Sequence, residues 1–307
     1  MSKFIVTTTI NPPSKALYEF SRMRDWTLVV AGDRKTPHGL FSNLQCVYLD
    51  PEKQESLYPE LSKAIGWNCV QRRNMAVYYA YEHGAELIAL VDDDNIPYDD
   101  WGVQIRIGKE TVATEFKTNL CVFNLLKHLG TKMWHRGYPV ELLSAPESVD
   151  VKQTTLVPDI QANLWNGAPD VDAICRMTMS TEVDGWKMDL PVTSNKYAPF
   201  NSQNTILARN VVPHYFLFPF IGRVDDIWAS YYVQSKGFKV VFDRATVFQE
   251  RNPHDLVKDL KLEVYGYRHT LALIKSLYEN PDNIYGFLPE QSGRAFGIWK
   301  AMFPEGS

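Results

Sequence analysis

An apolar run that ends in three consecutive carboxylates constrains this chain more than any other stretch. Residues 87–91 read Leu-Ile-Ala-Leu-Val, and Asp92, Asp93 and Asp94 follow directly. Such a run is typical of a strand buried on both faces, and ligands of open α/β sheets bind beyond the carboxyl ends of strands. Three adjacent acids repel one another, and Mg²⁺ and Mn²⁺ prefer carboxylate and phosphate oxygens. The stretch therefore predicts a metal and phosphate site, and the alternative is an acidic surface turn.

Strand and helix patterns alternate around this run. Residues 4–9 and 26–31 are rich in β-branched residues, and 47–49 is a third apolar segment. Their spacing favours βαβ units and a parallel sheet. Polar residues at the ends of the first two strands are expected to line a nucleotide crevice. They are Thr8, Thr9, Asn11 and Asp33. For Asp33, a simple turn beside a glycine is the alternative.

Two arginines begin the helix that leads into the acidic strand. Helical spacing extends over residues 68–83, and Arg72 and Arg73 lie in the first turns. The planar guanidinium group makes paired hydrogen bonds to phosphate oxygens. The pattern therefore predicts a diphosphate contact, although arginines on a solvated helix face are common.

A second acidic centre begins another helix. Asp225 and Asp226 open an amphipathic segment that extends to about Ser235. Acids at a helix N-terminus are favoured by the helix dipole, which is a complete structural explanation. A carboxylate there would also serve as a general base if it faced the metal site.

The middle of the chain offers polar and aromatic candidates. Residues 158–172 read as an irregular segment, in which Trp165 has the flat apolar face that stacks on sugars; core packing is the alternative. Asn204 belongs to a run of neutral polar residues that suits a hydroxyl-rich ligand, or is simply a polar loop before a strand. A pair of strands is expected within 103–112.

Composition sets the broad class. The chain has 307 residues, 45% of them hydrophobic, and a net charge of -4. This length supports one large α/β domain, predicted over 1–254, with a helical extension over 255–307 packed on it. The charge gives no electrostatic footprint for nucleic acid. The four cysteines have no zinc or CxxC spacing, and no signal peptide or membrane-spanning run is visible. We therefore expect a soluble cytoplasmic protein, or one whose targeting segment is not part of this sequence. A homo-oligomer is one option.

Several ordered stretches resemble known glycosyltransferases. The first half resembles STELLO-type glycosyltransferases. The later half resembles the related reversibly glycosylated polypeptides, the UDP-arabinopyranose mutases of plants. The stretches of the first half are residues 4–16, 29–37, 73–76, 82–85 and 92–95, and those of the later half are 136–139, 164–166, 169–173 and 222–229.

The resemblance implies a GT-A fold, with a mixed, mostly parallel central sheet, and a UDP-sugar donor. It places Asp92 and Asp94 as the outer pair of a DXD-type motif that holds Mn²⁺ or Mg²⁺, and the strand ends near Thr8 and Asp33 at the nucleoside. It places the acceptor base at Asp226, with Asp225 close behind. A late third metal ligand is implied, for which the sequence offers His254 or Gln249.

Two departures from these families matter. The plant mutases carry a glycosylated arginine at the position that aligns with Leu143, and leucine cannot take that role. The STELLO relatives are usually membrane-anchored, whereas this sequence shows no anchor. We therefore expect transfer to a separate acceptor hydroxyl: a glycan, a lipid-linked glycan, a protein or a modified nucleic-acid base. The alternatives are a UDP-sugar mutase and a non-catalytic scaffold that binds sugar nucleotides.

Overall fold

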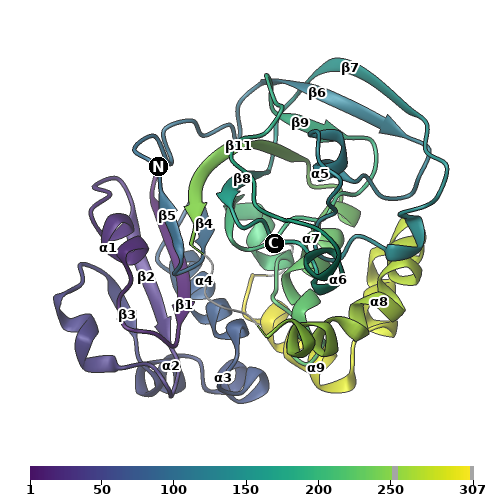
Figure 1. Cartoon of the computed structure of the whole chain (residues 1–307). Coiled ribbons are helices and arrows are strands. Elements are labelled where there is room, and N and C mark those ends of the chain that lie inside the picture. The colour runs from purple at the N-terminus through teal and green to yellow at the C-terminus, as the bar shows by residue number, and fades with distance from the viewer. Residues whose placement is uncertain (251–254, 305–307) are drawn as a thin grey trace.

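One mixed sheet forms the centre of the molecule (Figure 1). The computed structural model describes residues 1–250 and 255–304. The strand order is β3-β2-β1-β4-β10-β8-β11-β9-β6-β7, with β5 paired to β11. The strands are β1 Lys3–Thr9, β2 Thr27–Gly32, β3 Val47–Leu49, β4 Leu87–Val91, β5 Asn95–Pro97, β6 Thr111–Thr118, β7 Val149–Leu156, β8 Ile160–Gly167, β9 Val192–Ser194, β10 Asn204–Ala208 and β11 Val240–Gln249.

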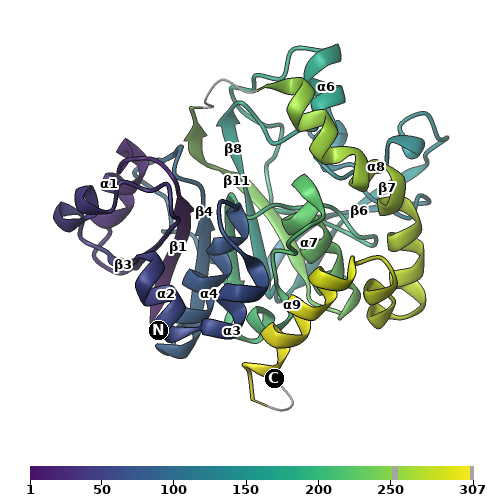
Figure 2. The same cartoon turned by 90° about the horizontal axis from the view of Figure 1, so that it is seen from below.

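Helices cover this sheet. In Figure 2, α2, α3 and α4 lie together beside the N-terminal strands, and α8 lies on the far side, near α6 and α7. The helices are α1 Lys15–Ser21, α2 Pro51–Leu57, α3 Pro59–Ile65, α4 Arg73–Glu82, α5 Leu125–His128, α6 Ala173–Thr178, α7 Asp225–Ser235, α8 Leu256–Glu279 and α9 Glu290–Ala301. Two 3₁₀ turns matter for the site, η2 Val70–Arg72 and η5 Gly222–Val224. The predicted α/β class with a mixed central sheet is confirmed, and it is the architecture that the resemblance to GT-A enzymes implies.

The acidic strand occupies the middle of the sheet. All five residues of β4 are buried, because β1 pairs with it in parallel on one side and β10 pairs antiparallel on the other. Val91 lies opposite Asn204, the first residue of β10. The carboxyl end of β4 therefore meets the start of β10, and the three aspartates leave the sheet at that edge.

Some local expectations were wrong. Residues 160–167 form the central strand β8 rather than an irregular segment. Its polar residues broke the apolar pattern, but they are buried and hydrogen-bonded; Gln161 donates to the carbonyl of Gln104 at 3.0 Å. No strand covers 103–110, and the pairing partners in this region are β6 and β7.

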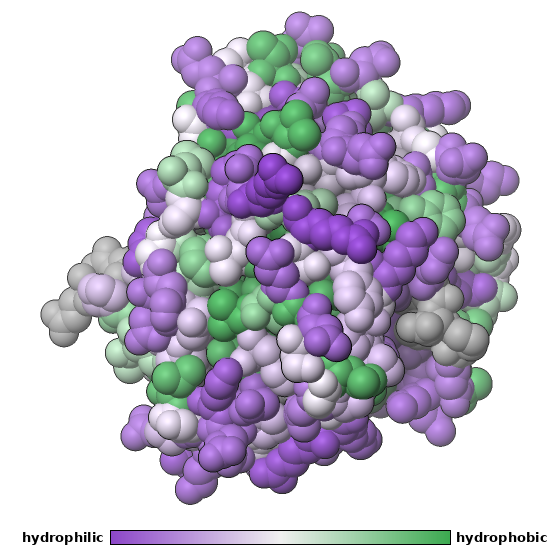
Figure 3. Space-filling model, turned by 90° about the vertical axis from the view of Figure 1, so that its left-hand side faces the viewer, coloured by the Kyte–Doolittle hydropathy of each residue, from purple (hydrophilic) through white to green (hydrophobic). Residues whose placement is uncertain are grey.

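The C-terminal residues are helical and packed on the rest of the chain. α8 contacts η5, α6 and α7, and α9 contacts α3. The proposed boundary at residue 254 and the candidate ligand His254 lie outside the described residues. Among the helices that the structure describes, none combines the length and apolar character needed to cross a bilayer. The face in Figure 3, the left-hand side of Figure 1, carries mainly hydrophilic groups with small hydrophobic areas between them.

A glycine makes the closest approach between α8 and the turn that precedes α7. Gly222 has a φ of +72°, and a Cβ there would lie 1.9 Å from the carbonyl oxygen of Leu262. We expect Gly222→Ala to lower the free energy of unfolding by about 2–4 kcal/mol, because backbone strain and overlap add. Urea denaturation measures this. Gly297→Ala in α9 is the control, since it meets open space and should be neutral or stabilising by up to about 1 kcal/mol. Equal stability of the Gly222→Ala variant and the wild type would contradict the packing of α8 described above.

Candidate active site

One cavity brings the two acidic centres together. It has a volume of about 300 Å³ and lies between the carboxyl end of β4 and the amino end of α7. Its lining residues are Thr8, Val70, Arg73, Asp92, Asp93, Asp94, Arg136, Asp170, Asn201, Ser202, Gln203, Gly222, Arg223, Asp225, Asp226 and Gln249. The predicted acids of both motifs are all among them.

The end of β1 holds Asp93, the middle one of the three consecutive aspartates. The Thr9 hydroxyl donates to the Asp93 carboxylate, and Asn11 Nδ2 donates to the same oxygen at 3.1 Å. Thr8 lines the cavity, and its hydroxyl donates to the carbonyl of Ala31 at 2.7 Å. The structure therefore brings Thr8, Thr9 and Asn11 to the acidic strand end, although two of them are engaged in fixing Asp93.

Arg73 connects the acidic strand to the loop before β10. Its guanidinium group is paired with Asp92 and donates to the Ser202 carbonyl at 2.7 Å and hydroxyl at 2.6 Å. The arginine is buried, whereas the Asp92 side chain is 33% exposed. Burial raises the pKa of Asp92, and the charge of Arg73 opposes that rise. The predicted arginine thus stands at the cavity, with its charge partly neutralised by Asp92.

The two acids of α7 have different environments. Asp226 accepts from the Ser202 backbone N–H at 2.9 Å and from its hydroxyl at 3.0 Å. It also accepts from Arg136 at 3.1 and 3.3 Å. Asp225 accepts from Gln71 Nε2 at 2.8 Å. Burial, followed by the adjacent Asp226 carboxylate, raises the pKa of Asp225 to about 7. Asp225 is therefore a carboxylate that can exchange a proton near neutral pH.

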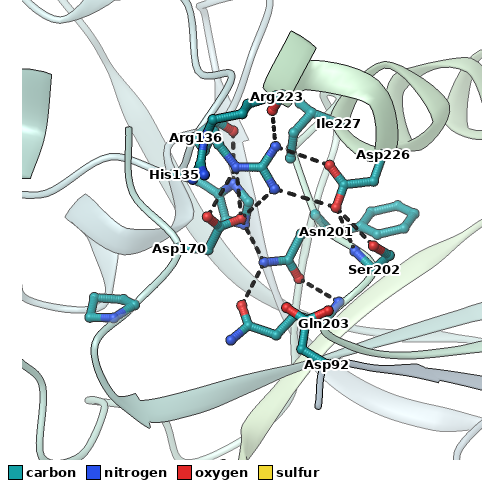
Figure 4. Close-up of polar contacts among 12 residues, drawn as sticks. Asp92, His135, Arg136, Asp170, Asn201, Ser202, Gln203, Arg223, Asp226 and Ile227 are labelled. Atoms are coloured by element: carbon teal, nitrogen blue, oxygen red, sulfur yellow. Dashed lines mark hydrogen bonds and ion pairs between the residues drawn. The ribbon is translucent and has the colours of Figure 1, made fainter. Parts of the chain in front are cut away.

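A buried guanidinium group connects Asp226 of the second acidic centre to Asp170. In Figure 4, Arg136 lies between Asp170 and Asp226. Its Nε donates to Asp170 at 3.0 and 3.1 Å and its Nη2 at 2.7 Å, and its Nη1 donates to the Arg223 carbonyl. Asn201 Nδ2 also donates to Asp170, at 2.8 Å. The resemblance had singled out the stretch around Arg136 as a motif, but its role in the site was not predicted. Nor was that of Asp170, because their pairing depends on the fold.

Among the residues that the structure describes, carboxylates exceed cations in the cavity. The described lining contains six aspartates against three arginines, and each of these arginines already has a partner on the protein. Arg223, for example, pairs with Asp259 at 3.2 Å and Glu263 at 3.0 Å, both from α8. A bare diphosphate would therefore enter a site of its own charge sign.

The cavity offers hard oxygen ligands for a cation. Gln249 has a buried side-chain oxygen, Oε1, that has no hydrogen-bond partner in the part of the chain that the structure describes. It lines the cavity together with Asp94, and β11 pairs Gln249 with Asn95, the residue after Asp94. Within residues 1–250 and 255–304, no three His, Cys, Asp or Glu side chains form a ready metal cluster. The oxygen atoms that do line the cavity fit Mg²⁺ or Mn²⁺, which are held by one or two carboxylates and complete their shell with waters and phosphates.

Four predicted residues lie away from the cavity. Asp33 is buried and accepts from the backbone N–H groups of Asn68 at 2.9 Å and Cys69 at 3.0 Å. Arg72 is fully buried among α2 and α3. Asn204 accepts from the Trp101 indole at 3.0 Å, and Trp165 packs in the core. The placements of Asp33 and Trp165 correspond to the structural alternatives of a turn and of core packing. Arg72 is buried rather than on a solvated helix face, and Asn204 begins β10 rather than lying in a loop.

Comparison with known proteins finds two relatives of the kind that the motifs resemble. The chain is 25% identical over 226 residues to an Arabidopsis thaliana protein named probable glycosyltransferase STELLO1, and 24% identical over 227 residues to STELLO2. Each match covers 66% of this chain and 29% of the relative, so the chain spans less than a third of these relatives. The matches confirm the resemblance to STELLO-type glycosyltransferases. No protein-family model matches the chain.

Among solved structures, the likenesses are distant. Staphylococcus aureus TarS, in complex with UDP-GlcNAc, has a TM-score of 0.44 at 13% identity, covering 97% of this chain and 73% of that one. Glucosyl-3-phosphoglycerate synthase from Mycobacterium tuberculosis, in complex with Mn²⁺, UDP-glucose and phosphoglyceric acid, has a TM-score of 0.40 at 11% identity, covering 94% and 81%.

Proposed function

We propose that this chain is a metal-dependent glycosyltransferase domain that moves a sugar from a UDP-sugar to an acceptor hydroxyl. The observation that carries the proposal is the single cavity lined by both acidic centres, Asp92–Asp94 and Asp225–Asp226. Support comes from the two relatives that are named probable glycosyltransferases. The acceptor classes named above all remain within the proposal.

The charge of the cavity supports metal dependence. A diphosphate cannot be neutralised by arginines that are already paired with aspartates, so a divalent cation is needed to hold it. We propose Asp92 and Asp94 as its protein ligands, with Gln249 Oε1 as a third and His254 as the alternative. When bound, the cation would neutralise the diphosphate and stabilise the leaving nucleotide. Thr8 and Arg73 line the same cavity, and we propose that they contact the nucleotide.

We propose Asp225 as the general base and Asp226 as the acid that orders the site, which reverses the preference drawn from the sequence. A base is most effective when its pKa lies near the working pH, and the pKa of Asp225 is raised to about 7. Asp225 accepts the proton of the acceptor hydroxyl while the acceptor oxygen bonds to the anomeric carbon. The bond from that carbon to the diphosphate oxygen breaks, and UDP leaves with the electron pair. Asp226 is occupied by Arg136 and Ser202.

The environment of Leu143 supports transfer to a separate acceptor rather than mutase chemistry. This residue is 37% exposed, and it is not among the residues that line the cavity. A sugar attached at that position would have to reach the acids from outside the cavity.

A thermal-shift panel of UDP-sugars, with and without Mn²⁺, tests the donor and metal assignments. A ligand that binds only the folded protein raises its melting temperature. We expect UDP and one UDP-sugar to stabilise the wild type only with Mn²⁺, and Asp94→Ala to abolish this gain. Asp184→Ala is the control, an aspartate outside the cavity lining that should leave the shift intact.

Two results would overturn parts of this proposal. A Mn²⁺-dependent UDP shift that survives in the Asp94→Ala variant would remove Asp94 from the metal site. No shift with any UDP-sugar in the presence of Mn²⁺ would contradict the glycosyltransferase assignment itself.

A further inference from the structure

We propose that Gln71 is a positioning residue that favours the ionised form of Asp225 against its buried surroundings and keeps the carboxylate directed into the cavity for the acceptor. This inference rests on the proposed function, in which Asp225 is the base. Gln71 belongs to η2, which lies on the chain far from α7, and its side chain crosses to the second acidic centre. Its Nε2 donates to Asp225 Oδ2 at 2.8 Å. Gln71 is 7% and Asp225 4% exposed, so water competes little for this contact.

Neighbouring groups do not replace this hydrogen bond. Asp226 repels the charge of Asp225, and Arg136 attracts it, but the Arg136 guanidinium group is hydrogen-bonded to Asp170 and Asp226. The Tyr215 hydroxyl belongs to the same cluster, where burial, followed by the charge of Asp226, raises its pKa, and the charge of Asp225 adds to that rise. Two neutral groups therefore act against burial and against the repulsion from the Asp226 carboxylate: the backbone of Asp226 and the side-chain amide of Gln71.

The position of Gln71 is fixed by the residue that follows it. Arg72 Nε donates to Gln54 Oε1 at 2.9 Å, and its Nη1 donates to the Ser62 hydroxyl at 3.1 Å. Its guanidinium group also stacks on the Trp67 ring, 3.6 Å from the ring centre. These contacts anchor η2 to α2 and α3. The phosphate contact predicted for Arg72 is thus replaced by an anchoring role.

Arg73, the residue after Arg72, extends to the first acidic centre. Arg73 pairs with Asp92, whereas Gln71 contacts Asp225. Three consecutive residues therefore connect the metal-side acid, the protein core and the acceptor-side acid. This arrangement fixes the two acids relative to each other, as proximity and orientation in catalysis require.

An amide donor to a carboxylate stabilises its charged form and lowers its pKa. Loss of the donor should therefore raise the pKa of Asp225, and a cation in its place should lower it. Two substitutions at one position then have opposite expected effects, which general damage to the fold cannot produce. The variants are Gln71→Met, similar in length but without a donor, and Gln71→Lys.

The test measures UDP release from the UDP-sugar that most stabilises the wild type, as a function of pH. In Gln71→Met, the apparent pKa of the acid limb of the kcat/KM profile should rise by about one pH unit. At pH values below that pKa, kcat/KM should therefore be roughly tenfold lower than in the wild type. The rate should approach that of the wild type at high pH. In Gln71→Lys the limb should move down. Gln161→Met, which removes a buried amide of β8 outside the cavity, should leave the limb in place.

A second readout does not depend on turnover. A carboxyl with a raised native pKa makes the native state less stable as pH rises, because the unfolded chain ionises more readily. As the pH rises from about 4 to 8, the unfolding free energy of the wild type should therefore decrease relative to that of Asp225→Asn. The unfolding free energy of Gln71→Met should decrease by more than that of the wild type.

The outcomes separate the two proposals. Absence of UDP release from every UDP-sugar would overturn the proposed function, and the pH dependence of unfolding would still test the contact. Shifts in the same direction for Gln71→Met and Gln71→Lys would overturn the role of Gln71. So would an unchanged acid limb in both variants, or a stability profile of Gln71→Met that parallels that of the wild type.

Discussion

Replacing Arg136 by Met is expected to lower the free energy of unfolding by about 3–5 kcal/mol, because it leaves buried carboxylates without their cation. Arg136 is hydrogen-bonded to both Asp170 and Asp226, and all three side chains are less than 10% exposed. Chemical denaturation at pH 7 measures this loss.

A surface arginine provides the matched control for this prediction. Arg22 pairs with Glu19 at 3.0 Å, but its side chain is 70% exposed. Arg22→Met should change stability by less than about 1 kcal/mol. Adding Asp226→Asn to Arg136→Met should recover part of the loss, since one uncompensated charge is removed. Additive losses in the double variant would show that the two side chains do not act as a pair.

The second large effect is expected at Asp225. Asp225→Asn should lower the rate of sugar transfer by about 10²–10⁴-fold, the usual contribution of a general base. Binding of UDP with Mn²⁺ should be unchanged, because Asp225 contacts Gln71 rather than the metal-side acids. Rates and UDP affinities of the Asp225→Asn and Asp226→Asn variants, measured side by side, test the assignment. Normal turnover in Asp225→Asn together with an inactive Asp226→Asn would assign the base to Asp226.

The same variant should change the pH dependence of stability. The pKa of Asp225 is raised from 3.8 to about 7, so its protonated form is favoured in the folded protein. Ionisation should therefore cost the native state on the order of 4 kcal/mol as pH rises from about 4 to 7. Asp225→Asn removes this cost, and its stability relative to the wild type should increase over that range.

Local patterns predicted the framework of the site well. The apolar run before Asp92 is the buried central strand β4, and Asp225 and Asp226 open α7 as expected. These features depend on residues close together in sequence, whose periodicity and capping chemistry are visible in the chain itself.

Features that depend on contacts between distant segments could not be predicted from local sequence patterns. Arg72 and Arg73 have the same side chain and adjacent positions, yet one enters the core and the other the cavity. The turn of the backbone at η2 separates them, and no local pattern reports that turn. The role of Arg136 likewise follows from its contact with Asp170 and Asp226, which only the folded chain brings together.

The most direct test of the account is the affinity of the wild-type chain for UDP, measured by titration calorimetry with Mn²⁺ and again with EDTA. The account predicts that UDP binds at least about tenfold more tightly with Mn²⁺, since the cavity carries more carboxylates than cations. Equal affinity for UDP in EDTA and in Mn²⁺ would contradict the central claim that the acids at the end of β4 form a metal-dependent nucleotide site.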